Sequence, residues 1–268
     1  MFFLHLQRAM NNRIEKKKVN RTKSICYAKI SMQYRIDFHC HSRFSADGVS
    51  EPEEMVRVAK RKGLNGFALT DHNTSAGIDY FEQIGLIRKD GLAVDNFLII
   101  PGQEITTKEG HLLALGIKLP DLKGIPALDA IALIHSMGGL AIAPHPFDYF
   151  RAGIRKRVLD QLPLDGIEVF NAAVTFKRCN QKAQAYAKER KLPMISASDA
   201  HDADVIGTAY TVVDAEEFSL QGILRAIARG TILEKKYISP KEALKKTWNN
   251  VFRFRSRQGA IRSLGKDN

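Results

Sequence analysis

The sequence predicts an α/β fold in which a mostly parallel sheet closes into a compact barrel with its helices outside. Short β-rich runs alternate with helical patterns along the middle of the chain, a rhythm typical of parallel sheets. Seven or eight such strands within about 200 residues favour a barrel over an open sheet. A Rossmann fold is excluded, because Gly138-Gly139 has neither the spacing nor the following helix of a dinucleotide-binding loop.

The strands are expected where the sequence is locally rich in β-forming residues. In chain order they cover 35–39 (RIDFH), 66–70 (GFALT), 97–101 (FLIIP), 111–116 (HLLALG), 140–143 (LAIA), 166–170 (GIEVF), 193–197 (PMISA) and, as a further candidate, 209–213.

Helical patterns fill most of the intervals. The first follows Ser50-Glu51-Pro52, a typical start signal, and the third is amphipathic and ends at Gly138-Gly139. In chain order the expected helices cover 53–62, 78–88, 128–137, 158–162, 180–190 and 220–229.

Composition indicates an ordinary globular protein. The 268 residues are 44% hydrophobic and 26% charged, which argues against a disordered or membrane protein. No apolar run reaches the roughly 18 residues of a membrane-spanning helix. Cys26, Cys40 and Cys179 are too few and too widely spaced for a disulfide framework. We therefore expect a reducing, cytoplasmic location.

The net charge of +12 belongs to the ends of the chain. Residues 1–31 hold 8 basic residues and 1 acidic residue, residues 235–268 hold 10 and 2, and residues 32–234 hold 23 and 26. We expect one barrel domain over 32–234, flanked by two basic extensions. A basic footprint for nucleic acid is therefore excluded for the barrel but not for the extensions.

Both extensions leave alternatives open. Residues 1–31 are expected to be an upstream, non-native extension before a start at Met32, rather than a disordered basic arm or a transit peptide. Ser239-Pro240 predicts the start of a C-terminal helix. Aromatic and arginine residues alternate in the tail that follows. A packed helix with a solvated basic tail is favoured over a nucleic-acid arm.

Six of the eight histidines, with several carboxylates, lie at the ends of predicted strands. These strand-end residues are His39, His41, Asp71, His72, Glu104, His111, His145, Asp199 and His201. The C-terminal ends of parallel barrel strands face the same side, so we expect these residues to converge. The two remaining histidines, His5 in the tail and His135 on a helix, are expected to be structural or solvated.

The convergent residues predict a metal centre. His39 and His41 are two residues apart on a strand, so they point to the same side and can hold one ion, and Asp199 and His201 repeat this spacing. Imidazole and carboxylate ligands without thiolate fit Zn, Mn or Fe. The number of ligands predicts two or three divalent ions, which favours phosphoester hydrolysis.

Together these motifs resemble the PHP family, named for polymerase and histidinol phosphatase. The resemblance covers residues 35 to about 213 and rests on motifs that occur in the family's order. These are Asp37-Phe38-His39-Cys40-His41-Ser42, Thr70-Asp71-His72-Asn73-Thr74, Pro101-Gly102-Gln103-Glu104, Gly110-His111, Pro144-His145-Pro146 and Ser198-Asp199-Ala200-His201.

The resemblance implies a distorted (β/α)7 TIM-like barrel with a trinuclear metal centre. Carried over by position, one ion takes His39, His41, Glu104 and Asp199. Glu104 bridges to a second ion, which is also held by His111 and His145. His72, His201 and Asp47 hold the third.

Four basic residues on loops after the fifth and sixth strands are candidates for binding the substrate phosphate. They are Arg151, Arg155, Lys177 and Arg178. Arginine suits bidentate phosphate binding, and we prefer Arg151 and Arg178. Solvated charges are the alternative reading.

Three carboxylates near the ligands are expected to act indirectly. Glu168, Asp71 and Asp37 are expected to orient ligands, with a structural ion pair as the alternative for Glu168. Cys40 is expected to be a core residue. His72 or His201 is expected to help protonate the leaving oxygen.

The sequence thus predicts a metal-dependent phosphoesterase that hydrolyses phosphate monoesters of nucleotide-like or sugar-phosphate molecules through a metal-bound hydroxide. One alternative is a 5′-3′ exonuclease on short RNA or DNA, with the basic tail as a binding arm. An amidohydrolase-type C–N hydrolase is disfavoured because no lysine occupies a corresponding strand end. A silent metal-binding module that recruits nucleic acid is disfavoured by the nearly complete ligand set. No membrane partner is expected, and the oligomeric state, the metal and the substrate are left open.

Overall fold

The computed structural model describes residues 31–239, in which nine strands form one sheet. The order across the sheet is β7-β6-β5-β4-β3-β2-β1-β8-β9. The strands are β1 Met32–Cys40, β2 Gly66–Leu69, β3 Leu98–Thr106, β4 His111–Leu115, β5 Leu140–Ala143, β6 Gly166–Asn171, β7 Met194–Ala197, β8 Tyr210–Ala215 and β9 Thr231–Glu234.

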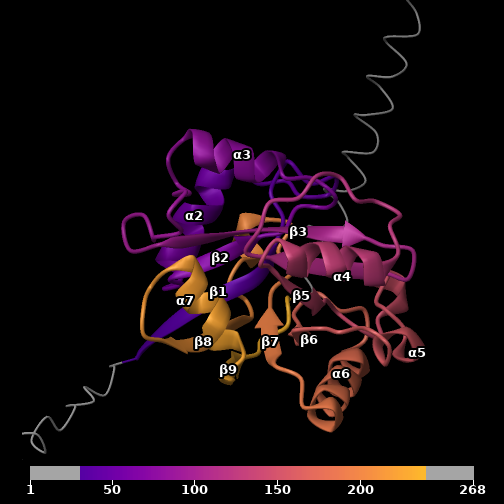
Figure 1. The fold of residues 1–268 in the computed structure, drawn as a ribbon. Helices are drawn as coiled ribbons and strands as arrows, with labels where there is room; N and C mark the ends of the chain where they lie inside the picture. The colour runs from indigo at the N-terminus through magenta and orange to yellow at the C-terminus, as the bar shows by residue number, and fades with distance from the viewer. Residues whose placement is uncertain (1–30, 240–268) are drawn as a thin grey trace, which may run out of the picture. The chain divides into compact units, whose positions relative to one another are not determined.

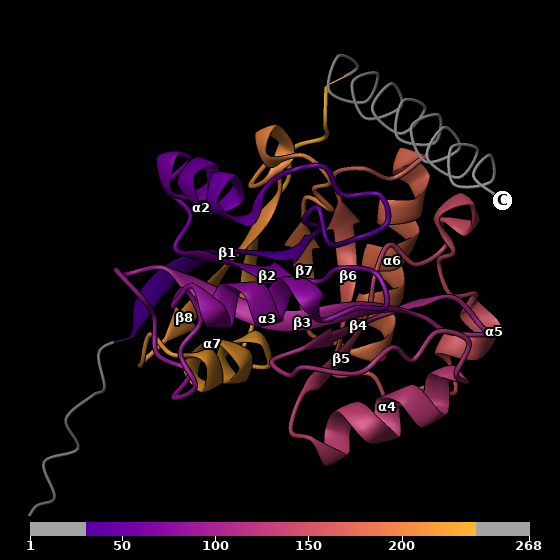
Figure 2. The ribbon, with the colours of Figure 1, turned by 90° about the horizontal axis from the view of Figure 1, so that it is seen from above.

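The helices surround the strands, which lie in the middle in Figure 1 and Figure 2. They are α2 Pro52–Arg61, α3 Ala76–Gln83, α4 Ala127–Ser136, α5 Lys156–Leu159, α6 Lys177–Arg190 and α7 Leu220–Ile227, with short 3-10 helices η1 Tyr149–Arg151 and η2 Ala203–Val205. This arrangement confirms the predicted single-domain α/β barrel.

The sheet is less parallel than expected. Strands β1, β2 and β3 pair in parallel, as do β5, β6 and β7, but β4 is antiparallel to both of its neighbours. Only residues 107–110 separate β3 from β4, and a parallel crossover needs a dozen residues or more. The hairpin places His111 opposite Thr106, so the start of β4 lies at the same end of the barrel as the C-terminal half of β3.

The barrel is nearly closed by contacts between β1 and the segment after β7. Cys40 forms a parallel bridge with Ala200, and the backbone N–H of His41 donates to the Ala200 carbonyl at 2.7 Å. The Asp37 carboxylate accepts from the Ser198 backbone N–H at 3.0 Å and from the Gly207 backbone N–H at 2.8 Å. The carboxylate of Asp37, which was expected to orient a histidine ligand, therefore ties the ends of the barrel together.

The interior of the barrel is packed below the histidine-bearing end. Buried residues from seven strands form one apolar cluster, which includes Ile36, Phe38, Ala68, Ile100, Leu113, Ile142, Ile195 and Val213. On the outside, Phe67 of β2 meets the rings of Phe81 and Phe97 edge to face. Strand β2 is buried along its whole length, as expected for a strand covered on both faces.

Several element ends differ from the prediction, and β1 begins at Met32 rather than at residue 35. Helix α3 stops at Gln83 rather than at residue 88, because Gly85 adopts φ +75° directly after the helix. Strand β3 runs five residues past Pro101, which brings Glu104 into the strand. Helices α5 and α6 begin before their predicted starts, and the edge strand β9 was not predicted.

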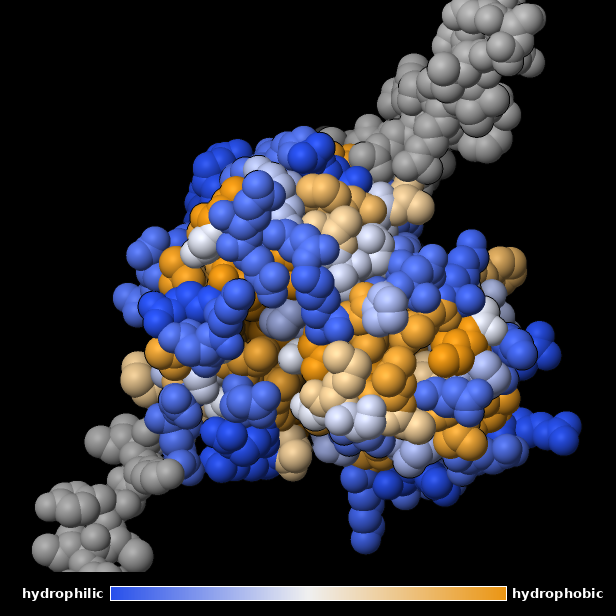
Figure 3. Space-filling model, turned by 45° about the horizontal axis from the view of Figure 1, so that its top comes forward, coloured by the Kyte–Doolittle hydropathy of each residue, from blue (hydrophilic) through white to orange (hydrophobic). Residues whose placement is uncertain are grey.

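The expected basic extensions fall outside the described residues, except Ser31 and residues 235–239, and so does the predicted helix from Pro240. Within residues 31–239, no helix has the length and apolar character needed to cross a membrane. Figure 3 shows apolar residues gathered on one part of the visible surface, with hydrophilic residues around them.

Candidate metal centre

The carboxylate of Glu104 lies at the centre of the convergent histidines. Strand β3 buries this side chain, which is 1% exposed. Its Oε2 atom lies 3.0 Å from Nε2 of His39, 3.1 Å from Nε2 of His41 and 3.4 Å from Nδ1 of His72. Oε2 of Glu104 thus faces imidazoles from the C-terminal end of β1 and from the segments that follow β1 and β2.

The other oxygen of Glu104 faces two different strands. Its Oε1 atom lies 2.8 Å from Nδ1 of His111 and 3.1 Å from Nε2 of His145. His111 opens β4 and His145 follows β5. Because its two oxygens face separate sets of imidazoles, this carboxylate has the geometry of a bridge between two ions.

Asp199 completes the side of the centre next to β1. Its Oδ1 atom lies 3.8 Å from Nε2 of His39, 3.5 Å from Nε2 of His41 and 3.3 Å from Nδ1 of His201. Asp199 has φ +53° and His145 has φ +28°, backbone conformations that are costly for residues other than glycine. Strain of this kind concentrates at functional sites.

A loop after β1 brings Asp47 to the outer side of the centre. Its Oδ2 atom lies 2.8 Å from Nε2 of His201 and 3.7 Å from Nε2 of His72. The Ser45 hydroxyl donates to Oδ1 of Asp47 at 2.9 Å and accepts from the backbone N–H of His72 at 3.2 Å. Asp47 is 35% exposed, so this part of the centre faces the solvent.

The side chains fit divalent cations. Nε2 of His41, Nδ1 of His111 and Oδ1 of Asp199 are buried and make no hydrogen bond, although buried polar atoms normally have partners. Within residues 31–239, four groups of ligand atoms lie close enough to share an ion. They are His41-Asp47-His72-His201, His39-His41-Asp199, His39-Glu104-His145 and His72-Glu104-His111. The predicted metal residues are thus all brought together, with donor types that suit Zn, Mn or Fe.

The electrostatics favour positive charge at the centre. Burial alone would lower the pKa of His41, but Asp199 and Glu104 outweigh it and raise that pKa to about 9. Burial would likewise raise the pKa of Glu104, yet the imidazoles of His72, His39 and His111 hold it well below its usual range. The carboxylates around His39 and His41 thus favour positive charge there, and they would attract a metal cation in the same way.

Glu168 positions two of the histidines from behind. Its Oε1 atom lies 3.2 Å from Nδ1 of His39, and its Oε2 atom accepts from the backbone N–H of His145 at 2.6 Å. A proton on Nδ1 of His39 leaves Nε2 free to face Glu104, the arrangement usual for metal-binding histidines. This placement agrees with the expected orienting role of Glu168.

Sequence reasoning missed Asn171. Its side-chain amide donates to Oδ2 of Asp199 at 3.0 Å and to Oε2 of Glu168 at 2.9 Å. Its amide group thus donates a hydrogen bond to each of these two buried carboxylates. Its position in the sequence could have indicated this role. Asn171 is the last residue of β6, and the histidine motifs likewise lie at or just after the ends of other strands.

The four expected phosphate-binding residues lie in different settings. Arg151 reaches the centre, but its guanidinium already pairs with Oδ2 of Asp199 and donates to the Ala173 carbonyl. Arg178 lies over the Phe176 ring, Arg155 over the Tyr149 ring, and Lys177 over the Tyr237 ring. These last three residues each contact an aromatic ring and belong to none of the ligand groups.

The remaining candidates act elsewhere. Asp71 accepts from the Ser42 backbone N–H at 2.6 Å and from the Ser42 hydroxyl at 2.7 Å, so it fixes the loop after β1 rather than a histidine ring. Cys40 is fully buried in an apolar cluster, as expected. His135 pairs with Asp165 at 2.7 Å, away from the centre.

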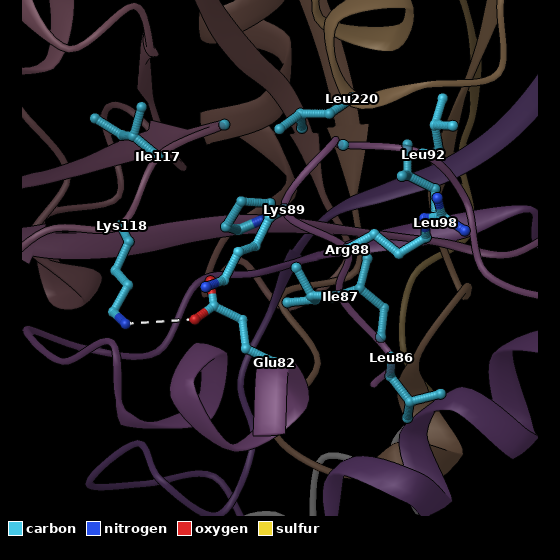
Figure 4. Close-up of a pocket in the computed structure, with 14 residues that line it drawn as sticks. Glu82, Leu86, Ile87, Arg88, Lys89, Leu92, Leu98, Ile117, Lys118 and Leu220 are labelled. Atoms are coloured by element: carbon cyan, nitrogen blue, oxygen red, sulfur yellow. Dashed lines mark ion pairs between the residues drawn. The ribbon is translucent and has the colours of Figure 1, made fainter. Parts of the chain in front are cut away.

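A pocket of about 170 Å³ lies at the opposite end of the barrel, where β3 begins and β4 ends (Figure 4). Three cations line it: Lys118 pairs with Glu82 at 3.6 Å, Arg88 pairs with Asp90, and Lys89 is the third. Leucine and isoleucine side chains form much of the rest of its wall. It brings together no ligand set comparable to that around Glu104.

Comparison with known families agrees with the sequence motifs. Residues 37–161 match the sequence profile of the PHP domain, and residues 177–232 match a profile described as PHP-associated. Together the two matches include every expected metal ligand.

Individual relatives cover different shares of the chain. An uncharacterized protein of Methanocaldococcus jannaschii is 37% identical over 148 residues, 52% of this chain and 82% of that protein. A 5′-3′ exoribonuclease of Haemophilus influenzae is 51% identical over 88 residues, 31% of this chain and 29% of the exoribonuclease.

A solved structure shares the fold. It is a two-domain protein of Bacteroides vulgatus described as containing a predicted PHP-like metal-dependent phosphoesterase. The TM-score is 0.58 at 24% identity, over 81% of this chain and 70% of that one.

Proposed function

This chain belongs to the PHP family of metal-dependent phosphoesterases, and we propose that it hydrolyses phosphate monoesters of nucleotide-like or sugar-phosphate molecules at a trinuclear centre. The proposal assigns His39, His41, Glu104 and Asp199 to one ion, Glu104, His111 and His145 to a second, and Asp47, His72 and His201 to a third.

One observation carries the proposal. Glu104 is 1% exposed and directs Oε2 toward three imidazoles and Oε1 toward two others. Several kilocalories per mole would be needed to bury this carboxylate without compensating charge. Two neighbouring cations on its two oxygens would supply that charge. Paired ions polarise phosphoryl oxygens and lower the pKa of a coordinated water, which is the chemistry that phosphoester hydrolysis needs.

The chain's own residues shape the site around this chemistry. Glu168 and Asn171 hold His39 and Asp199 in place, and Arg151 neutralises one oxygen of Asp199. In this proposal, Arg151 acts first by positioning Asp199. Arg178 is exposed on α6, and we propose it as the arginine that meets a substrate phosphate.

Histidine is the residue type best suited to protonating a leaving oxygen near neutral pH, and His72 is the better placed of the two candidates. Its imidazole is 17% exposed, whereas that of His201 is 3% exposed. His201 also contacts Asp47 through Nε2 and the Asp199 carbonyl through Nδ1. Burial, together with neighbouring His41 and His111, lowers the pKa of His72 to about 4. Its imidazole is therefore neutral near pH 7, the form that binds metal, and this limits its role as an acid.

A second candidate is 5′-3′ exonuclease action on short oligonucleotides. It is favoured by the high local identity with the Haemophilus influenzae exoribonuclease. Both activities break a phosphoester bond and need the same metal centre. They differ in the group attached to the reacting phosphate, which is a small molecule in the first case and an oligonucleotide in the second.

A substrate panel separates the candidates. The full chain is loaded with Mn and assayed for released phosphate on mononucleotides and sugar phosphates, and for released mononucleotides on 5′-phosphorylated trinucleotides. Phosphate release from the small molecules, abolished by EDTA and in His39→Ala, supports the first proposal. Mononucleotide release without phosphate release supports the second, and no release from any substrate contradicts both.

The cellular setting is also part of the proposal. Among the described residues, Cys40 and Cys179 are buried free thiols, which suits a reducing, cytoplasmic compartment.

A further inference from the structure

Exposed aromatic side chains gather beside the metal centre. Among residues 31–239, Tyr149, Phe150 and Phe176 are the exposed aromatic residues, and Phe150 is 82% exposed. The rings of Phe150 and Phe176 meet edge to face with centroids 5.8 Å apart. We call these three residues the aromatic platform.

Hydrogen bonds fix the platform to the metal ligands. Tyr149 and Phe150 belong to η1 with Arg151, whose guanidinium pairs with Asp199. Phe176 directly precedes α6, on the loop that follows β6. The two loops are joined by Arg151, which donates to the Ala173 carbonyl at 3.2 Å, and by the Thr175 N–H, which donates to Asp148 at 2.6 Å.

The surroundings of the platform are positively charged. Residues 145–157 and 171–182 hold seven Lys and Arg residues and one acidic residue, Asp148, which is buried. Arg155 lies 5.2 Å over the Tyr149 ring, and Arg178 lies 5.1 Å over the Phe176 ring. An exposed ring face among cations suits a planar base that is attached to phosphates.

We propose that the aromatic platform stacks an unpaired nucleobase of a short single-stranded nucleic acid whose reacting phosphate lies at the metal centre. Phe150 supplies the ring face, and Phe176 supports it edge to face. The number of cations on both loops favours an oligonucleotide over a mononucleotide, because more than one phosphate can be bound. This inference rests on the second candidate of the proposed function and names the residues that would select its substrate.

Base stacking is measured directly with a fluorescent probe. The probe is a 5′-phosphorylated trinucleotide with 2-aminopurine as its first base, whose fluorescence falls when the base stacks. Its phosphorothioate linkages resist hydrolysis, and it is titrated into the Mn-loaded full chain, so that binding is observed with little turnover. Phe150→Ala and Phe176→Ala are compared with Phe150→Trp and with Leu128→Ala, which truncates a 55% exposed side chain on α4.

We expect quenching by the parent, Leu128→Ala and Phe150→Trp, and an affinity about tenfold lower in Phe150→Ala. With Mn bound, Phe150→Ala should raise KM for the trinucleotide by a similar factor and leave kcat unchanged. Leu128→Ala, on the surface of α4, should leave both KM and kcat for the trinucleotide unchanged. No quenching by the parent, or equal affinity in Phe150→Ala, would overturn the proposal.

Three further results are informative. Equal quenching and equal KM effects with a 2-aminopurine mononucleotide would overturn the assignment to oligonucleotides. A lower melting temperature of full-length Phe150→Ala, with unchanged probe affinity, would show that the ring packs against the chain itself. Quenching that depends on Phe150 without hydrolysis of any substrate would support the platform and contradict the proposed function alone.

Discussion

The guanidinium of Arg151 holds Oδ2 of Asp199, while Oδ1 of the same carboxylate faces the imidazoles of His39, His41 and His201. Arg151 is 21% exposed at its side chain, and its Nε atom makes no hydrogen bond. This contact favours orientation of a proposed metal ligand as the role of Arg151, whereas the sequence indicated phosphate binding.

Replacing Arg151 separates these roles. Arg151→Met keeps much of the side-chain length but removes the contact with Asp199. We expect about 10–100-fold weaker metal binding, the usual effect of losing a residue that orients a ligand. The Mn concentration for half-maximal activity measures this, with Arg155→Met as the control. A raised KM for substrate at unchanged metal affinity would instead establish a phosphate-binding role.

Asn171 is expected to matter for stability as well as for the site. Asn171→Asp places a third carboxylate between Glu168 and Asp199 and removes the donor that serves both. We expect the free energy of unfolding in EDTA to fall by about 1–3 kcal/mol, measured by urea denaturation. The control is Asn65→Asp. Oδ1 of Asn65 accepts from the backbone N–H of Arg35, and an aspartate can accept the same hydrogen bond. The free energy of unfolding of this control should therefore change by no more than about 0.5 kcal/mol. Equal effects of the two substitutions would contradict this account.

Gly48 controls the position of Asp47. A Cβ atom at Gly48 would lie 1.9 Å from the carbonyl oxygen of Ser42, so Gly48→Ala must move the loop that carries Asp47. We expect it to lose one bound ion relative to the parent while the ions at Glu104 are retained. Elemental analysis of purified protein measures this, and Asp47→Asn should give the same loss without moving the loop. A full metal content in both variants would exclude Asp47 as a ligand.

Metal stabilisation should depend on pH with a definite sign. Without a bound ion, the protonated imidazole of His41 contributes stability that is complete below its unfolded pKa of about 6.5. That contribution is lost as the pH rises through the folded pKa of about 9. Metal needs the neutral imidazole, so its stabilisation grows over the same interval. We expect the difference in melting temperature between Mn-loaded and EDTA-treated protein to increase from pH 6.5 to pH 9. A difference that falls with pH would contradict the assignment of His41 as a ligand.

The sequence predicted the strands that carry the site well, because buried strands and strand-end histidines are local patterns. It did not predict the antiparallel direction of β4, since strand direction depends on how the chain returns after Thr106. The assumption of a parallel sheet would have placed His111 at the wrong end of the barrel. The hairpin explains why a histidine at the start of a strand reaches Glu104.

Contacts between distant segments were harder to foresee. The pairing of Arg151 with Asp199 spans 48 residues, and that of Asp37 with Ser198 spans 161. Asn171 is not part of a metal-ligand motif. Its contacts with Glu168 and Asp199 depend on the pairing of β6 with β7, which the sequence alone does not show. Residues of this kind are found from geometry, whereas the ligands themselves follow from residue type and spacing.

A comparison of the parent with Glu104→Gln tests the proposed bridging position of Glu104. Full-length parent and Glu104→Gln are purified in parallel, and bound metal per chain and phosphoester hydrolysis are measured on the same samples. The account predicts two or three ions in the parent, at least one fewer in Glu104→Gln, and hydrolysis reduced more than about 100-fold. Equal metal content and equal activity in the two proteins would contradict it.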